Sequence, residues 1–237
     1  MFLTAPPGTG KTVFLSDMLY ALSSGSSFLE FPGCEPLECI YFSIEMFFEE
    51  QQYFWKMQVK GWEKRDLFDQ NVKTFFDKDV DEQFMEGIIK HFRPQVVIID
   101  SMADLVMDAK EEEARRITRF ILRMRELYNV SFVIIHHNRK NDNTQSVRKP
   151  RGLSDLYGSY ILARSCQTVI SLWKDEKKTY FELDALKGRF MADLKTIHLS
   201  RDENLNYKRI QINVGGDTGT APKGNVLINS FLTGDSG

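Results

Sequence analysis

A phosphate-binding pattern occupies residues 5–12 of the chain. The segment reads Ala-Pro-Pro-Gly-Thr-Gly-Lys-Thr and fits the P-loop pattern G-x-x-x-x-G-K-[ST], with alanine in the first glycine position. Glycines in such a loop let backbone N–H groups point at the β-phosphate, the lysine reaches the β and γ oxygens, and the Ser/Thr hydroxyl ligates Mg²⁺. The pattern predicts a site for ATP with Mg²⁺. The residues expected to bind the nucleotide are Pro7, Gly8, Thr9, Gly10, Lys11, Thr12 and Val13, with Thr12 also a ligand of Mg²⁺.

Two acidic residues follow apolar strands and could complete the chemistry of this site. Asp100 ends the run 96–99 and has the position of a Walker B carboxylate, which orients Mg²⁺, often through a water molecule. Glu45 follows the run 40–44, where a carboxylate can face the γ-phosphate and position or deprotonate the attacking water. The alternative for Glu45 is a helix N-terminal residue that the helix dipole favours.

A third strand end carries two adjacent histidines. The run 132–135 leads into His136 and His137, at the carboxyl edge where open α/β sheets bind their ligands. Adjacent strand residues point to opposite faces, so we expect one of them, His137, to sense the γ-phosphate and His136 to be packed or hydrogen-bonded locally. The alternative is two histidines with structural partners only.

The segment 138–151 has the most concentrated positive charge in the chain and no apolar periodicity. A basic loop after the sensor strand could contact a phosphate backbone and couple that contact to the nucleotide state. A solvated surface loop is the alternative. The residues expected to contact nucleic acid are Arg139, Lys140, Arg148, Lys149 and Arg151.

A second pair of cations follows a predicted strand far from the P-loop in sequence. Lys187 and Arg189 are two residues apart, so both side chains lie on one side of an extended segment. Such a pair can stabilise charge on the phosphates of a neighbouring subunit, as an arginine finger does. Taken alone, exposed pairs of this kind are also common surface features.

Composition limits the classes of protein to which the chain can belong. With 237 residues and 42% hydrophobic content, it can bury the core of one large α/β domain. The net charge of −2 excludes a globally basic nucleic-acid binder. The 3 cysteines have no metal-ligand spacing, and no apolar run approaches the roughly 20 residues needed to cross a bilayer. These features predict a reduced, soluble cytoplasmic protein that does not bind membranes.

Short apolar runs alternate with helical patterns and predict a mostly parallel twisted sheet flanked by helices. One helix is indicated by Ile117, Phe120, Ile121, Met124 and Leu127 on a single face. We expect residues 1–213 to form one core, with 214–237 a Gly-, Ser- and Thr-rich loop or tail. Parallel strands are expected at 2–4, 39–44, 72–75, 96–100, 132–136 and 167–172, and antiparallel strands extending one edge of the sheet at 179–186, 194–200 and 207–213.

Taken together, these motifs resemble the RecA-like ATPase core, and most closely the RepA/DnaB group of hexameric replicative helicases. Phe-Ser-Ile-Glu-Met at 42–46 is similar to the Phe-Ser-Leu-Glu-Met of DnaB-type helicases, and Ile-Ile-His-His-Asn-Arg-Lys at 134–140 to the His-His-x-x-Lys of RepA-type ones. Gly158-Ser159 resembles the Gly-Ser that follows the DNA-binding loop in this group. The sequence departs from the pattern at Ala5 and after Arg189, where the Asn-Gly-Pro run of DnaB is absent, and we expect it to lack the N-terminal domain of that group.

The resemblance implies ATP hydrolysis at the subunit interfaces of a hexameric ring, with single-stranded DNA in the central channel and replication partners such as a primase. The leading hypothesis is therefore an ATP-driven DNA translocase, a replicative helicase. Two alternatives are a RecA- or KaiC-like ATPase that acts in recombination or signalling through assembly, and a regulatory module that hydrolyses ATP poorly. The catalytic residues that the resemblance implies are Lys11 and Glu45 with His137 in one subunit and Lys187 and Arg189 from the next.

Overall fold

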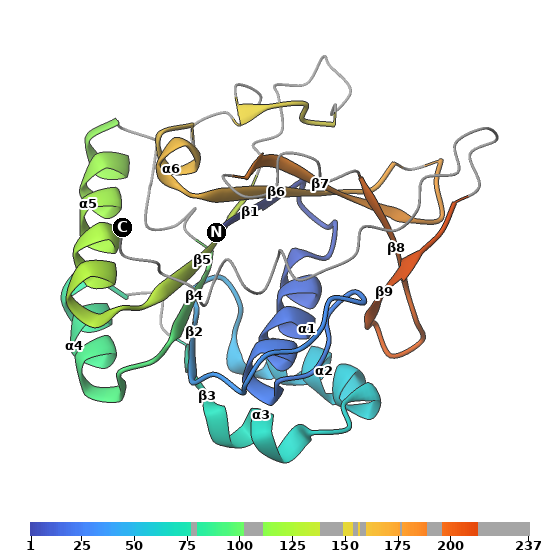
Figure 1. The fold of residues 1–237 in the computed structure, drawn as a ribbon, viewed down its shortest axis with the longest axis horizontal. Helices are drawn as coiled ribbons and strands as arrows, with labels where there is room; N and C mark the ends of the chain where they lie inside the picture. The colour runs from blue at the N-terminus through green and yellow to red at the C-terminus, as the bar shows by residue number, and fades with distance from the viewer. Residues whose placement is uncertain are drawn as a thin grey trace.

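The computed structural model describes residues 1–76, 80–101, 111–137, 149–153, 156, 160–175, 177–188 and 196–212. Within these residues one sheet has nine strands in the order β3-β2-β4-β5-β1-β6-β7-β8-β9 (Figure 1). The strands are β1 (Phe2–Ala5), β2 (Cys39–Ser43), β3 (Val72–Phe76), β4 (Val96–Asp100), β5 (Ser131–His137), β6 (Thr168–Trp173), β7 (Phe181–Gly188), β8 (Ile197–Arg201) and β9 (Tyr207–Ile210). The helices are α1 (Lys11–Ser24), α2 (Phe48–Gln58), the short 3-10 helix η1 (Val59–Gly61), α3 (Arg65–Asn71), α4 (Glu82–Phe92), α5 (Glu111–Tyr128) and α6 (Tyr160–Ser165).

The strands β1 to β6 pair in parallel and form the centre of the sheet. Every residue of β1, β2 and β4 is buried, which explains why these strands read as unbroken apolar runs rather than as alternating patterns. The predicted ranges of these six strands differ from the observed ones by at most one residue at either end. The predicted mostly parallel sheet is confirmed.

The antiparallel extension predicted near the C-terminus is also present. Strands β7, β8 and β9 follow β6 in the sheet and pair antiparallel with their neighbours. Some of their limits differ from the predicted ones by two or three residues. The segment 214–237 lies outside the described residues.

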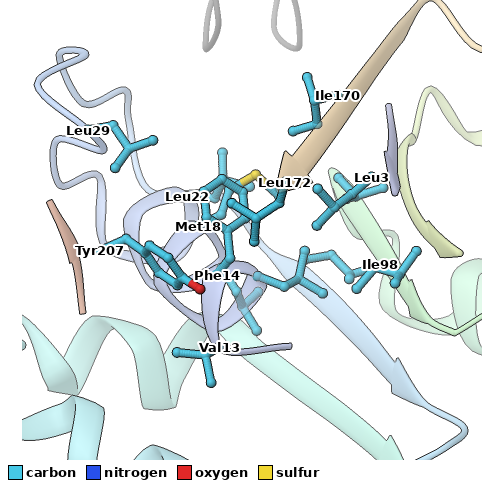
Figure 2. Packing of buried hydrophobic residues seen from close by; sticks show 14 of the residues in the cluster. Leu3, Val13, Phe14, Met18, Leu22, Leu29, Ile98, Ile170, Leu172 and Tyr207 are labelled. Atoms are coloured by element: carbon cyan, nitrogen blue, oxygen red, sulfur yellow. The ribbon is translucent and has the colours of Figure 1, made fainter. Parts of the chain in front are cut away.

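Helices cover both faces of the sheet (Figure 1). On one face α1, α2 and α3 pack over a core that also includes residues of β8 and β9, and on the other α4, α5 and α6 pack over a second core. Figure 2 shows the first core, where Phe14, Met18 and Leu22 of α1 lie against Leu172 of the sheet and Tyr207 of β9. This packing fixes the beginning of α1, and with it the phosphate-binding segment, on the sheet.

Helix α5 follows the predicted apolar pattern with one exception. Ile117, Phe120 and Met124 are buried, whereas Leu127 is 57% exposed. At about 100° per residue, Leu127 lies about 60° from Met124 and at the margin of the buried stripe, so the prediction that it belongs to the core face was wrong. None of the described helices is long and apolar enough to cross a membrane.

Candidate functional site

The segment between β1 and α1 forms a tight turn that leaves the beginning of α1 open. The Thr9 N–H and hydroxyl both donate to the carbonyl of Pro6, at 3.3 and 2.8 Å. Gly8 and Gly10 have φ angles of 73° and 93°, which are strained for any residue with a side chain. No side chain caps the first turn of α1, and the space around the missing Cβ of Gly8 is empty. The helix N-terminus can therefore present its N–H groups to an anion.

Lys11 is 5% exposed and lies in the mouth of this turn. Its ammonium donates to the carbonyls of Ala5 and Pro6, at 3.2 and 3.0 Å. Burial lowers the pKa of Lys11 to about 8, and the neighbouring carboxylates of Asp100 and Glu45 partly oppose this shift. The turn therefore holds a buried ammonium that faces two carboxylates.

Those carboxylates come from adjacent strands. Strand β2 pairs with β4 so that Ser43 lies opposite Asp100, and the Ile44 N–H donates to the Asp100 carbonyl at 2.6 Å. Just beyond the ends of these strands, the buried Ser101 hydroxyl donates to the Glu45 carboxylate. The sheet register, and not the sequence spacing alone, brings Glu45 and Asp100 to the same edge.

Tyr41 is a further member of the site that the sequence did not indicate. Its hydroxyl donates to the Asp100 carboxylate at 2.7 Å, in a fully buried position. Burial and the nearby Asp100 charge raise the pKa of Tyr41 well above its usual value, so the hydroxyl remains protonated and acts as a donor. Nothing in the linear pattern distinguishes Tyr41 from the apolar residues on either side of it.

These groups fit a nucleoside triphosphate with Mg²⁺. An open helix N-terminus and a buried ammonium suit phosphate oxygens, while a carboxylate and a hydroxyl are the hard oxygen donors that Mg²⁺ prefers. The structure places Thr12 in the first turn of α1 and Asp100 at the end of β4, so these two residues would hold the metal. Glu45 would remain available for a water molecule.

Strand β9 also contacts the turn between β1 and α1, through Tyr207. The Tyr207 hydroxyl lies 3.4 Å from the Thr9 carbonyl and 3.3 Å from the Gly10 carbonyl, with geometry for donation to either. A Cβ at Gly10 would lie 2.7 Å from this hydroxyl, so the turn needs glycine there for packing as well as for its φ angle. Sequence analysis placed no functional residue in β9, because the contact joins residues 198 positions apart.

Asp17 joins this strand to α1 and α2. Its buried carboxylate accepts the Tyr207 N–H at 2.6 Å and the Gln58 amide at 2.9 Å. Burial raises the pKa of Asp17 to about 7, although both hydrogen bonds lower it. The folded state therefore binds a proton more tightly at Asp17 than the unfolded chain does.

We expect Asp17 to make the protein less stable as the pH rises from about 4 to about 7. Between the unfolded pKa near 3.9 and the folded value, the folded state carries the extra proton, so stability present at low pH is lost on titration. The expected loss between pH 5 and 8 is about 2–3 kcal/mol. Asp17→Asn should remove this part of the pH dependence in urea unfolding at the two pH values. If the unfolding free energy changed by the same amount between the two pH values in wild type and variant, the assignment of this pH dependence to Asp17 would be wrong.

The two histidines of β5 lie at the expected edge of the sheet. His137 is opposite Ala5, the residue that leads into the phosphate-binding turn, and the His137 side chain lies outside the described structure. The His136 ring lies 5.9 Å from the ring of Phe2. The strand end therefore approaches the site, and the sensor role of His137 stays a prediction.

Two of the five basic residues predicted to contact nucleic acid are described. Lys149 forms ion pairs with Glu182 at 2.5 Å and Asp184 at 2.7 Å, both on β7, whereas Arg151 is exposed. Burial lowers the pKa of Lys149, but the hydrogen bonds and charges of these carboxylates outweigh it and raise the value. Two carboxylates therefore already neutralise the charge that Lys149 could offer to a phosphate. Arg139, Lys140 and Arg148 lie outside the described residues.

Lys187 lies at the opposite edge of the sheet from the phosphate-binding turn. It pairs with Val169 near the start of β6, whereas Ala5 is at the carboxyl end of β1. Its ammonium donates to the carbonyl of Arg164. Lys187 therefore does not reach the turn of its own chain. Arg189 and the Gly158-Ser159 pair lie outside the described residues.

Comparisons with known proteins agree with this geometry. A family described as AAA domain (AAA_25) matches residues 1–143. Among solved structures, the KaiC-like protein PH0186 from Pyrococcus horikoshii OT3 has a similar fold, with a TM-score of 0.60, 16% identity, and coverage of 89% of this chain and 88% of that one. A search of curated proteins found no match. The fold is RecA-like, as the resemblance predicted, and the helicase subgroup is not distinguished.

Proposed function

This chain belongs to the AAA domain family whose model matches residues 1–143, and on that basis we propose that it binds and hydrolyses MgATP at the carboxyl edge of its RecA-like sheet. The observation that carries the proposal is the convergence of three groups. The buried Lys11 ammonium lies in the charge field of both Asp100 and Glu45, at the open N-terminus of α1. A P-loop, a metal-binding carboxylate and a second carboxylate for water are the parts that phosphoryl transfer needs.

Each residue then has a separate task. Lys11 exchanges the carbonyls of Ala5 and Pro6 for phosphate oxygens and stabilises their negative charge. Thr12 and Asp100 would hold Mg²⁺, and the bound metal would supply positive charge to the triphosphate. Glu45 orients the attacking water and accepts its proton, and the Ser101 hydroxyl fixes the orientation of the Glu45 carboxylate.

We further propose that a second copy of the chain completes the site. Lys187 lies at the opposite edge of the sheet from the P-loop of its own chain. Together with Arg189 it would instead contact the γ-phosphate bound by a neighbouring subunit. In this arrangement His137 senses the same phosphate from within the subunit, because β5 ends beside β1. A hexameric ring is the assembly that the helicase resemblance implies.

Two candidate functions that ATP hydrolysis could drive have support. Translocation on single-stranded DNA is supported by the RepA/DnaB-like motifs and by the basic segment 138–151, of which Arg151 is exposed. An ATPase that acts through nucleotide-dependent assembly is supported by the similarity of the fold to that of a KaiC-like protein. We propose translocation as the first candidate and assembly as the second.

The two candidate functions differ in how hydrolysis responds to DNA. For a translocase we expect single-stranded oligonucleotide to raise the ATPase rate several-fold, with an effect that weakens as salt rises. Arg151→Ala should increase the DNA concentration needed for half-maximal stimulation several-fold, because it removes one phosphate contact. Arg119→Ala, which removes an exposed charge from α5, is the matched control.

Steady-state ATPase assays with and without oligonucleotide measure these effects. The assembly ATPase would be favoured if DNA did not change the ATPase rate and the oligomeric state differed between the ATP-bound and ADP-bound protein. Absence of ATP hydrolysis and ATP binding under all conditions would overturn the proposed function itself.

A further inference from the structure

A chain of buried polar contacts joins the two residues proposed to hold Mg²⁺. Tyr41 donates to Asp100 at 2.7 Å and lies 3.3 Å from the side-chain oxygen of Gln51. The Gln51 amide donates to Ser16 at 3.4 Å, and the Ser16 hydroxyl donates to the carbonyl of Thr12 at 2.9 Å. The chain thus runs from the end of β4, through β2 and α2, to the first turn of α1.

All the side chains in this chain are removed from water. Tyr41 is 1%, Gln51 0% and Ser16 3% exposed, and Asp100 is 3% exposed. Buried polar groups need partners, and hydrogen bonds between them are stronger in surroundings of low dielectric constant. Four elements, β4, β2, α2 and α1, therefore meet through directional polar contacts at the metal end of the site.

Trp55 adds a second contact from α2 to the same point. Its indole N–H donates to the Ser16 hydroxyl at 3.2 Å, and its ring lies 6.3 Å from the ring of Tyr41. Ser16 therefore accepts bonds from two residues of α2 while donating to α1. The position of α2 relative to α1 is set by polar geometry at this point.

We infer that Tyr41 and Gln51 are positioning residues of the metal site, which set the orientation of the Asp100 carboxylate and its separation from Thr12. The inference rests on the proposed MgATP site. Neither residue touches the nucleotide or the metal in this assignment, because Tyr41 acts through Asp100 and Gln51 acts through Tyr41 and Ser16. A metal-ligating carboxylate that has lost such an outer partner typically binds its metal 10- to 100-fold more weakly.

The tyrosine has a single hydroxyl proton and two acceptors within reach. Asp100 is the closer and charged acceptor, so it takes the proton, while the Gln51 oxygen limits where the hydroxyl can turn. Removing the hydroxyl alone would take from the Asp100 carboxylate the donor that fixes this oxygen. Removing the Gln51 amide would leave Tyr41 bonded to Asp100 but detach both from α1.

The test measures metal affinity directly rather than turnover. Mn²⁺ is titrated by electron paramagnetic resonance into protein saturated with AMPPNP, a non-hydrolysable ATP analogue, and AMPPNP binding is measured separately in the presence of a chelator. We expect Tyr41→Phe to weaken Mn²⁺ binding by about tenfold or more and Gln51→Met to weaken it several-fold. Metal-free AMPPNP binding should change by less than about twofold, because Lys11 and the P-loop backbone are untouched.

Tyr20→Phe is the matched control. It removes a hydroxyl from α1 that accepts a bond from the Lys64 N–H, away from the metal end of the site, and should leave Mn²⁺ affinity unchanged. A merely structural role for Tyr41 would lower the melting temperature and weaken both titrations equally. If Tyr41→Phe does not fold, Gln51→Met still tests the inference, since Asp100 keeps its donor there.

The outcomes separate this inference from the proposed function. Wild-type and variant proteins with equal Mn²⁺ affinities would overturn the positioning role while leaving the MgATP site intact. Wild-type protein that binds neither AMPPNP nor AMPPNP with Mn²⁺ would overturn the proposed function. Selective loss of Mn²⁺ affinity in both variants supports the inference.

Discussion

Replacing Glu45 with glutamine is expected to reduce the rate of ATP hydrolysis by about 10²- to 10⁴-fold while MgATP still binds. Glutamine has nearly the same shape and can still accept the bond from the Ser101 hydroxyl, so the local structure should persist. It cannot accept a proton from the attacking water. Binding depends on Lys11, the P-loop backbone and the metal, none of which the substitution changes.

Single-turnover hydrolysis and equilibrium binding of MgATP separate these two effects. Glu49→Gln is the matched control, because Glu49 is an exposed carboxylate in the first turn of α2 and should give wild-type rates. If Glu45→Gln hydrolysed ATP as fast as Glu49→Gln, Glu45 would be the helix N-terminal residue of the alternative interpretation and another group would activate the water.

The predictable parts of the site are those formed by residues that are consecutive in the sequence. The P-loop is a local pattern, and a buried strand that ends in aspartate is recognisable once that loop is known. The order of strands and helices follows from the periodicity of apolar residues, so the central sheet was also predictable. In each case the structure depends on residues that are close together in the sequence, so a short segment is enough to recognise it.

The unpredicted members of the site depend on contacts across the sheet. Tyr41 and Asp100 are 59 residues apart, and Asp17 and Tyr207 are 190 apart. In the sequence Tyr41 is one more apolar strand residue, and Asp17 is an acidic residue in a helix. Only the register of β2 on β4, and the return of β9 to α1, turns them into partners.

The role of the basic residues was the part of the site that the sequence predicted least well. Lys149 was grouped with four other cations because they are close in sequence, yet its ammonium lies between Glu182 and Asp184 of a strand more than 30 residues later. A cluster of like charges in a sequence says nothing of the carboxylates that the fold brings to it. Lys149 therefore gives the nucleic-acid proposal less support than composition suggested.

Lys11→Ala is expected to weaken MgATP binding by roughly 10²- to 10⁴-fold and to make hydrolysis undetectable. Hydrogen bonds to charged groups contribute about 1.5–3 kcal/mol each, and the ammonium would make two such bonds to the β and γ oxygens. The substitution also leaves Asp100 and Glu45 facing the triphosphate without a compensating charge. Titration with a fluorescent ATP analogue measures the loss, and Lys60→Ala on the exposed η1 helix is the control.

The pH dependence of binding gives a second test of the same ammonium. Burial lowers the pKa of Lys11 to about 8 in the free protein, and bound phosphates would raise it by favouring the charged form. Wild-type affinity should therefore be constant below pH 8 and fall by up to about tenfold per unit above it, because binding must then take up a proton. Lys11→Ala has no such proton to take up, so its weaker affinity should not change between pH 7.5 and 9.5. A wild-type affinity that stayed constant over that range would place the Lys11 ammonium outside the phosphate site.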